Sequence, residues 1–555
     1  MMKILDQLIK LTLVVCVVSS LAVAQRQHGA RPTDTGGPLM FEQAVFDVQN
    51  YDITINADPR SKSITGTTIM TARTVIPTNV IVLDLDTPYT ISKVTDGSTD
   101  LRYERKDGRI WIWYPMTKQV GEEIKTSITY SGIPRLAPNP PWVGGFMWSK
   151  TPNGADWISV ALQNDGADLL FVCKDHPSDK PATASMHLTV PTPLVAVGPG
   201  KLEGVKQNPD NTATYSWRMT NPISNYSLVF NAAPYKTIED SYKSVTGETV
   251  PIIFYVLPES FEKGAGLIAE TKKYAAFFEK YLGPYPFRSQ KLGIVETPHL
   301  GMEHSTAIAY GNQFKYNENG TDWLMLHEFG HEWWANLVTA SDWRDFWIHE
   351  GFQSYMDSLY EEHRAGKAAY LASMKNRIPN LRNMQPVAPR EPKIAYEVYL
   401  SAPDYVTSDG DIYGKGAVVL HSLRYLIGDD AFFRSLRRMS YPTKEMETWT
   451  DGRQTRLVNT DDFLYIAEQE SKMDLDWFFE MYLRQPKLPK LVTEMSGDML
   501  NLRWETPNNM PFEMPIDVVV AGKTQRVAMK DGKASIPYSG TTPVIDPDGW
   551  VLRAK

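Results

Sequence analysis

The chain has little cysteine and no long apolar stretch in its interior, and each shortage argues against a class of protein. Only 2 cysteines occur among 555 residues, so a small fold held together by disulfides is excluded and stability must come from buried apolar cores. After the N-terminal segment, no run approaches the roughly 20 apolar residues of a transmembrane helix. Positive charge is not in excess either, since the net charge is -8, which argues against nucleic acid as a partner.

The first 24 residues are typical of an export signal. Two lysines flank the start of an apolar run at 11–18, and the small residues of Ala22-Val23-Ala24 suit a signal peptidase. We therefore predict a signal peptide at 1–24, and a mature protein that is periplasmic or secreted and has no integral membrane segment. Cys16 leaves a lipoprotein signal as an alternative, although Val15 is bulky where such a signal needs a small residue.

Signal cleavage would leave Cys173 as the single cysteine of the mature chain. A lone cysteine can be a nucleophile. However, free cysteines are usually buried, and the apolar run 169–173 favours a buried thiol in a strand.

The pattern of apolar residues changes along the mature chain and predicts its domains. Residues 25–44 are rich in Gly, Pro, Thr and Arg and predict a flexible lead-in. From 45 to 235, short alternating runs separated by Gly, Pro and Asp predict an N-terminal antiparallel β domain. Helical periodicity dominates at 236–487, and residues 488–555 return to β alternation. The predicted fold class is therefore multidomain α+β.

A pair of histidines at helical spacing is the first sign of chemistry. A helix that Thr321 or Asp322 can cap carries His327, Glu328 and His331 in the pattern H-E-x-x-H. Residues four apart lie one turn apart on the same face, so both imidazoles can reach one metal ion. The physical interpretation of this pattern is two zinc ligands and a general base. The simpler alternative is two polar histidines at a domain contact.

Glu350 favours the metal interpretation. It is separated from His331 by eighteen residues and begins another helical pattern. Two histidines and one carboxylate leave the fourth position of a tetrahedral zinc open for water, as a catalytic site requires. The sequence therefore predicts one Zn²⁺ per chain, held by His327, His331 and Glu350.

With these motifs the chain resembles the gluzincin aminopeptidases, the family of aminopeptidase N and leukotriene hydrolase. H-E-x-x-H followed after eighteen residues by Glu, in the context W-x-x-E-G-F, is the family's zinc signature. Further stretches are similar to family motifs in the same order along roughly residues 45 to 550. These stretches are Gln163 ahead of Cys173-Lys174-Asp175, Gly283-Pro284-Tyr285-Pro286-Phe287, Gly301-Met302-Glu303 and Tyr413-Gly414-Lys415-Gly416.

The resemblance implies a fold and an activity. The implied fold is an N-terminal antiparallel β domain, a thermolysin-like, mostly helical catalytic domain and a small β-sandwich-like C-terminal domain. The implied activity is a zinc-dependent aminopeptidase that releases N-terminal residues from peptides with a free N-terminus. Glu328 would activate the attacking water, and Tyr413 would stabilise the oxyanion. The residues implied to bind substrate are Glu303, Gly301, Met302 and Gln163.

Three positions leave details of the site open. His304 and His349 stand where the family has asparagine, which leaves the geometry of amine recognition and the pH optimum undecided. Asp357, seven residues after Glu350, is either a carboxylate that orients a zinc-ligand histidine or a solvated helix residue.

Further functions share part of this pattern. A thermolysin-like endopeptidase has the same zinc site but does not need Glu303. The pattern also allows an epoxide hydrolase of the leukotriene hydrolase type and a catalytically inactive peptide-binding protein. The full set of zinc ligands, base and tyrosine argues against a mere binder. The oligomeric state and the preferred N-terminal side chain are not predicted.

Overall fold

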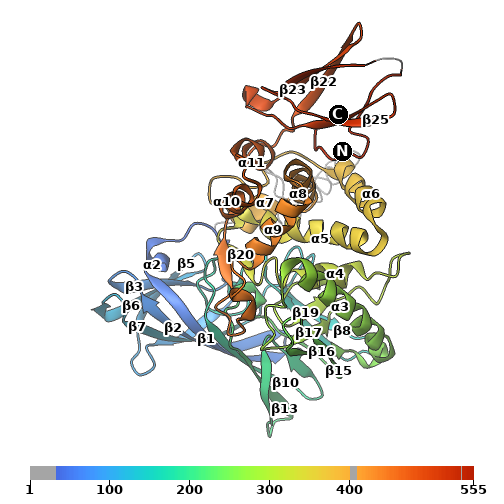
Figure 1. Ribbon diagram of the computed structural model, residues 1–555. Helices are drawn as coiled ribbons and strands as arrows, with labels where there is room; N and C mark the ends of the chain where they lie inside the picture. The colour runs from blue at the N-terminus through green and yellow to red at the C-terminus, as the bar shows by residue number, and fades with distance from the viewer. Residues whose placement is uncertain (1–32, 400–408, 539–540, 555) are drawn as a thin grey trace, which may run out of the picture.

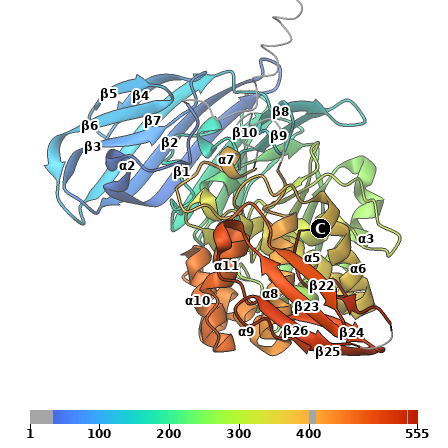
Figure 2. The ribbon, with the colours of Figure 1, turned by 90° about the horizontal axis from the view of Figure 1, so that it is seen from above.

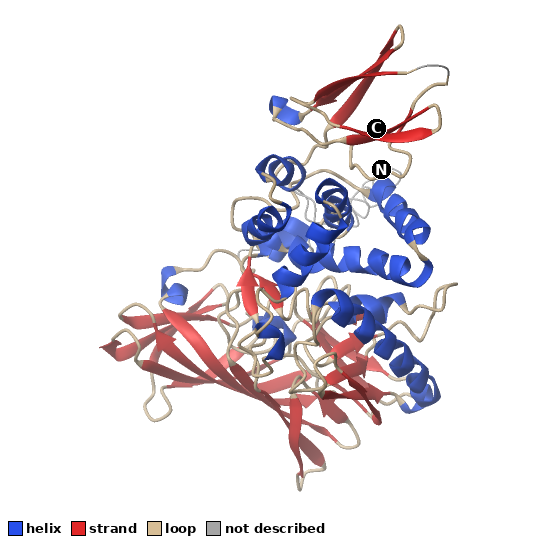
Figure 3. Cartoon of the chain, in the orientation of Figure 1, coloured by secondary structure: helices blue, strands red, loops and turns tan. Residues whose placement is uncertain are grey.

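A computed structural model describes residues 33–399, 409–538 and 541–554. Strands dominate the first and last parts of the described chain, and helices dominate the middle (Figure 3). The predicted signal peptide at 1–24, with Cys16, lies outside the described residues. Across the described stretches, every helix is too short or too polar to span a bilayer.

The N-terminal region is a β domain, as predicted. Its strands are β1 (Phe46–Asp58), β2 (Ser63–Thr74), β3 (Thr78–Asp84), β4 (Thr90–Thr95), β5 (Arg102–Lys106), β6 (Arg109–Lys118), β7 (Glu123–Gly132), β8 (Gly145–Lys150), β9 (Asp156–Ala161), β10 (Thr183–Pro191), β11 (Val195–Val197), β12 (Lys201–Gln207), β13 (Thr212–Met219) and β14 (Asn231–Ala233). They form a seven-stranded sheet, β12-β13-β10-β1-β2-β7-β4, a four-stranded sheet, β11-β14-β9-β8, and a three-stranded sheet, β3-β6-β5.

Two details of this domain differ from the sequence prediction. The pair β1·β10 is parallel, while the other pairs of the seven-stranded sheet are antiparallel. A parallel pair needs a long crossover, which β2 to β9 supply here. Cys173 is buried, as expected, but it makes only an isolated bridge to Asp84 and does not lie in a strand. The nearby carbonyls of Leu169 and Leu170 accept hydrogen bonds from tyrosine side chains, so they need no neighbouring strand.

The described part of the predicted flexible lead-in makes hydrogen bonds to the β domain. The Thr35 hydroxyl donates to Asp168 Oδ1 at 3.1 Å, and Gly36 N donates to the carbonyl of Asp175 at 2.9 Å. A short helix, α2 (Phe41–Ala44), follows. Burial of the Asp168 carboxylate explains the attachment, because a buried carboxylate requires hydrogen-bond donors.

The middle region combines helices with a five-stranded sheet. Its helices are α3 (Phe261–Leu282), α4 (Trp323–Gly330), α5 (Trp347–Ala365), α6 (Lys367–Arg377), α7 (Ala395–Tyr399), α8 (Gly414–Ile427), α9 (Asp429–Ser440), α10 (Thr460–Ser471) and α11 (Asp476–Leu483). Its strands are β15 (Lys236–Lys243), β16 (Thr249–Val256), β17 (Leu292–Glu296), β18 (Gly301–Met302), β19 (Ile308–Tyr310), β20 (Val338–Ala340) and β21 (Arg456–Val458). The sheet order is β15-β16-β17-β19-β18, so β18 is an edge strand.

The C-terminal strands form two three-stranded sheets, β22-β23-β26 and β25-β24-β27. These strands are β22 (Lys490–Ser496), β23 (Met499–Glu505), β24 (Ile516–Val520), β25 (Lys523–Val527), β26 (Lys533–Pro537) and β27 (Val544–Ile545). They lie on the helices, on the side away from the N-terminal sheets (Figures 1 and 2). Trp550 stacks on His421 of α8, with ring centroids 4.4 Å apart. The sandwich-like packing of this module stays a prediction.

Two glycines let α5 and α8 cross at backbone contact. A Cβ built on Gly416 of α8 would lie 2.8 Å from the Cα of Gly351 in α5. Glu350 directly precedes Gly351, and Tyr413 is the N-cap of α8. The crossing therefore brings Glu350 and Tyr413, which are far apart in the sequence, to one place.

We expect Gly416→Ala to lower the free energy of unfolding by about 1–3 kcal/mol, because the added methyl group meets backbone that cannot turn aside. Gly266→Ala in α3 is the matched control, since its Cβ would meet only the Tyr316 hydroxyl at 3.7 Å. That control should gain up to about 1 kcal/mol from helix propensity. Thermal unfolding of the two variants measures the difference. A Gly416→Ala protein as stable as the unmodified chain would contradict the close crossing.

Candidate active site

Helix α4 presents the first two predicted ligands. Asp322 is its N-cap, and its Oδ1 accepts from the backbone N of Met325 at 3.1 Å. His327 lies in the last turn of the helix, and His331 is its C-cap. Because the two residues are one turn apart, their imidazoles point to the same side. The local sequence alone is therefore sufficient to pair them.

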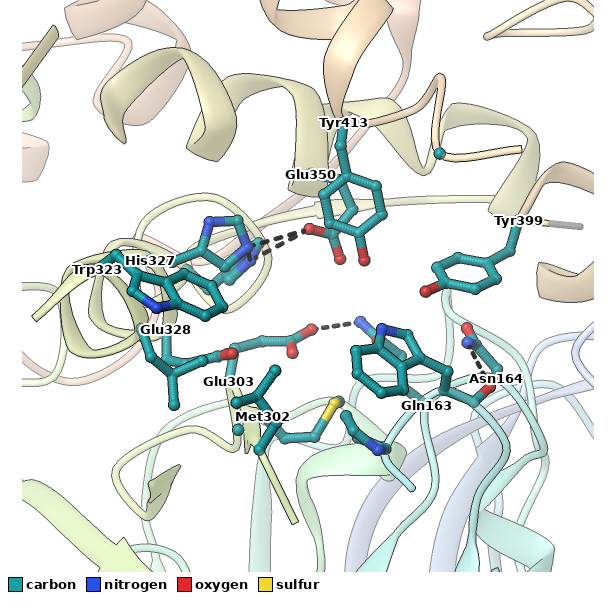
Figure 4. Close-up of a pocket in the computed structure, with 17 residues that line it drawn as sticks. Gln163, Asn164, Met302, Glu303, Trp323, His327, Glu328, Glu350, Tyr399 and Tyr413 are labelled. Atoms are coloured by element: carbon teal, nitrogen blue, oxygen red, sulfur yellow. Dashed lines mark hydrogen bonds and ion pairs between the residues drawn. The ribbon is translucent and has the colours of Figure 1, made fainter. Parts of the chain in front are cut away.

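The three predicted ligands meet in space (Figure 4). The Nε2 atoms of His327 and His331 are 3.2 Å apart, and Glu350 Oε2 lies 3.5 Å from the first and 3.4 Å from the second. Ligands of a tetrahedral zinc, each about 2 Å from the ion, are separated by about 3.3 Å. The three atoms therefore surround a point about 2 Å from each of them. Glu350 Oε2 is buried and accepts no hydrogen bond from a described residue, which fits a metal-ligand oxygen.

Contacts on the far side of each imidazole fix its orientation. His327 Nδ1 lies 2.9 Å from Asp357 Oδ2, and His331 Nδ1 lies 2.8 Å from the carbonyl oxygen of Trp334. A carbonyl oxygen only accepts, so Nδ1 of His331 carries the proton and its Nε2 lone pair is free for a metal. The Asp357 carboxylate likewise accepts from Nδ1 of His327, which leaves the Nε2 lone pair of His327 free for a metal. Asp357 therefore contacts a histidine of the predicted metal site and is not a solvated helix carboxylate.

Glu328 lies beside the triad in the same cavity. It is buried, and burial raises its pKa to about 8 against the opposing field of His327. A Cβ on Gly301 would lie 2.7 Å from Glu328 Oε1. A larger residue at position 301 would displace the end of the Glu328 side chain, so the glycine of the G-M-E motif leaves room for the Glu328 carboxylate.

Glu303 and Gln163 come from different domains and are in contact. Gln163 Nε2 donates to Glu303 Oε1, which also accepts from the Tyr226 hydroxyl at 3.0 Å. The backbone carbonyl of Glu303 accepts from Asn336 Nδ2 at 2.9 Å. Burial raises the pKa of the Glu303 carboxyl. A cation placed against Glu303 would remove this cost of burying a charge.

One cavity of about 340 Å³ is lined by the three predicted ligands together with Glu328, Glu303, Gln163 and Gly301. Apolar side chains form much of its wall, including Trp142, Leu300, Met302 and Trp323. Figure 4 shows Trp323 and His327 at one side of this cavity, and Gln163 and Asn164 at the other. The predicted substrate-binding residues Gly301, Met302, Glu303 and Gln163 all line it.

Tyr413 faces the triad from the N-terminus of α8. Its ring is roughly parallel to that of His327, with ring centroids 6.2 Å apart. The ring centroid of Tyr399 is also 6.2 Å from that of Tyr413. Burial and the neighbouring Glu350 carboxylate raise the Tyr413 pKa well above its ordinary value. The hydroxyl therefore stays protonated and remains a hydrogen-bond donor.

Comparison with known proteins finds one family at two places in the chain. Residues 48–227 match the peptidase M1 N-terminal domain, and residues 268–482 match the peptidase family M1 domain. The chain belongs to the M1 family of peptidases. The resemblance predicted from the motifs is confirmed.

Relatives of this M1 peptidase are distant. Human glutamyl aminopeptidase is 25% identical over 433 residues, which are 74% of this chain and 43% of that protein. Leucyl aminopeptidase of Saccharolobus solfataricus is 23% identical over 396 residues, 66% of this chain and 46% of that protein. The chain spans about half the length of these curated relatives.

Solved M1 structures share the fold. A mutant M1 zinc metallopeptidase from Deinococcus radiodurans, solved with a Tyr-Ser-Ala substrate, matches with a TM-score of 0.65 and 22% identity. The match covers 83% of this chain and 99% of that one. A second structure of the Deinococcus radiodurans enzyme gives a TM-score of 0.64 at 23% identity and covers 80% of this chain and 96% of that one. At these identities the likeness establishes the fold alone.

The two unusual histidines of this M1 peptidase do not line the cavity. His349 Nε2 accepts from the backbone N of Ala340 at 2.9 Å, and burial lowers the His349 pKa to about 3. Burial likewise lowers the pKa of His304 to about 3. Both imidazoles are therefore neutral near pH 7, and neither is placed to contact substrate.

Several groups that line the cavity or contact its residues gave no signal in the sequence. Tyr226 lies in a short 3-10 helix (Asn225–Ser227) between β13 and β14, and Trp142 and Tyr399 come from different domains. The Trp334 carbonyl is a backbone group, which no residue type reveals. A composition or spacing pattern could not have found these groups, because each reaches the site only through the tertiary fold.

We expect Asp357→Asn to weaken zinc affinity by about 10- to 100-fold, because the residue that orients His327 loses its charge. Competition with a chromogenic chelator measures the affinity. Glu361→Gln is the matched control, since Glu361 lies one turn further along α5 and pairs with Arg364 at 2.6 Å. Equal affinity in the Asp357→Asn and unmodified proteins would contradict the orienting role.

Proposed function

We propose that the protein is a zinc aminopeptidase that removes the N-terminal residue from peptides. The observation that carries this proposal is the buried carboxylate of Glu303 in the same cavity as the His327, His331 and Glu350 triad. A free amino terminus is a cation, and a buried carboxylate is the group that compensates it. An endopeptidase cleaving within a chain would have no cation to place there.

Glu303 and Gln163 are suited to hold the ammonium group together. Glu303 Oε1 already accepts from Gln163 and Tyr226, which leaves Oε2 as an acceptor for the substrate. Because Gln163 uses its Nε2 to donate, its Oε1 is a second acceptor. The edge strand β18 (Gly301–Met302) can in addition pair with substrate backbone by strand addition.

His327, His331 and Glu350 would hold one zinc ion. When bound, zinc supplies a Lewis acid that polarises the scissile carbonyl and lowers the pKa of a water to about 7. Glu328 takes the proton of the attacking water and returns it to the departing amine. Burial favours the neutral form of Glu328, which helps this carboxylate to take up the proton.

Tyr413 is the proposed donor to the carbonyl oxygen. Negative charge develops on that oxygen as water attacks, and a fixed donor there contributes about 10²–10³ in rate. The protonated hydroxyl of Tyr413 beside the Glu350 carboxylate meets this need.

The cavity disfavours an acidic first side chain. Trp142, Met302 and Tyr399 offer apolar surface beside the amine site. No lining residue that the structure describes is Lys or Arg, and the segment 400–408 contains neither. An acidic side chain would therefore meet the carboxylates without compensation.

We further propose that residues 1–24 direct export and that the mature protein acts in the periplasm or outside the cell. The lysines, the apolar run and the small residues before Gln25 support this. The single cysteine of the described residues is a buried free thiol, so the fold there needs no disulfide.

We expect hydrolysis of leucyl anilide and almost none of N-acetyl-leucyl anilide, because acetylation removes the ammonium group that Glu303 binds. Glu303→Gln should lower kcat/KM on the unblocked substrate at least about 30-fold, or about 2 kcal/mol, since it removes one partner of a buried charge pair. Its zinc affinity should be unchanged. Equal rates on the blocked and unblocked substrates would eliminate the aminopeptidase proposal and favour an endopeptidase.

We expect Glu328→Gln to abolish turnover while the protein retains zinc, because the amide cannot accept the proton of water. Tyr413→Phe should lower kcat by about 10²–10³ with little change in KM. Steady-state kinetics together with metal analysis of the purified variants provide the measurement. Normal turnover by Glu328→Gln would refute the proposed base.

A further inference from the structure

A second cavity of about 450 Å³ adjoins the first beyond His327. Trp323, His327 and Tyr413 line both cavities. The wall of the second cavity also contains Asn317, Thr321, Ser354, Asp357, Ser373 and Arg377. Unlike the first cavity, it is lined mainly by hydroxyl, amide and charged groups, which suit peptide backbone and chain ends.

The position of this cavity defines the path of a bound peptide. Trp323 and His327 lie at the side of the first cavity opposite Gln163 and Asn164 (Figure 4). Neither Glu303 nor Gln163 lines the second cavity. A peptide whose amino group sits on Glu303 can therefore pass the triad and reach the second cavity beside Trp323.

Arg377, the last residue of α6, offers a donor toward this space. Its Nε donates to Ser358 Oγ at 3.1 Å, and its Nη2 donates to the Ser354 carbonyl at 2.8 Å. Its Nη1 has no acceptor among the residues that the structure describes. The side chain is 24% exposed, so it is held in place and still reaches the cavity.

The acidic groups of the cavity already have partners. Asp357 lies 2.9 Å from His327 Nδ1 and accepts from Gln353 Nε2 at 2.9 Å, while its contact with Arg377 is longer, at 3.8 Å. Glu361 pairs with Arg364 at 2.6 Å. Arg377 is therefore the lining cation with donor capacity left for a ligand, as far as the described residues show.

We propose that this cavity binds the C-terminal end of short peptides and that Arg377 binds their terminal carboxylate. The inference rests on the proposed aminopeptidase function and adds a substrate class to it. Asp357 lies between the guanidinium and the His327 ring. Its Oδ2 is 3.8 Å from Arg377 Nη2 and 2.9 Å from His327 Nδ1. An extended chain advances at most about 3.3–3.6 Å per residue, so roughly two residues fit between the cleaved bond and Arg377. Tripeptides with a free carboxylate are the expected substrates.

The test compares Leu-Gly-Gly with its C-terminal amide, using the zinc-loaded full chain. We expect kcat/KM to favour the free acid by about 10- to 100-fold, the value of one charge-assisted hydrogen bond. In Arg377→Met the ratio of acid to amide should fall to about one, and in Arg377→Lys part of it should return. Arg382→Met is the matched control, because Arg382 does not line the cavity, and it should keep the full ratio.

A binding measurement removes any dependence on turnover. Titration calorimetry of Leu-Gly-Gly and its amide on the Glu328→Gln protein should show the same preference, and adding Arg377→Met should abolish it. Equal binding and turnover of acid and amide by the unmodified protein would overturn the inference. A purely structural Arg377 would overturn it too, since its loss would lower both substrates together and preserve their ratio. Failure of the proposed function would look different, because leucyl anilide would then not be cleaved at all.

Discussion

The site depends on three ligand atoms from two helices being held within 3.5 Å of one another. Close packing of α4 on α5 provides this. A Cβ on Gly330 would lie 1.9 Å from Gln353 Oε1, so a larger residue at position 330 would displace the Gln353 amide from α4. Gln353 in turn donates to Asp357, which lies 2.9 Å from His327 Nδ1. The contact of Gln353 with Gly330 thus supports Asp357, and Asp357 in turn supports the His327 imidazole of the predicted metal site.

The same arrangement concentrates negative charge where water is scarce. Glu303, Glu328 and Glu350 are buried around one cavity, and burial raises the pKa of Glu328 to about 8 and also raises that of Glu303. Carboxylates in such a place are costly unless cations join them. A dication bound at the triad and an ammonium group bound at Glu303, as in the proposed function, would supply that compensation. On that proposal, the electrostatic cost of burying these carboxylates favours binding of a metal and of an amino terminus.

The sequence predicted those features that short-range geometry fixes. The spacing of His327 and His331 follows from one helical turn, and the start of α3 and its end before Gly283 follow from helix periodicity and stop signals. Local patterns misplaced Cys173 in a strand, because distant tyrosines satisfy the backbone of that segment. They also predicted a flexible lead-in where Thr35 binds a buried aspartate. In both cases long-range side-chain contacts outweighed local propensity.

What the sequence determined by itself was the chemistry: two imidazoles, three carboxylates and a tyrosine, in the order and spacing of M1 peptidases. Only the tertiary structure decided which groups meet. It brought Gln163 of the β domain against Glu303 and placed Arg377 beside the cavity beyond His327. The physical reason is that spacing along the chain fixes neighbours within a helical turn. Contacts between domains and between crossing helices depend instead on how whole buried surfaces fit together.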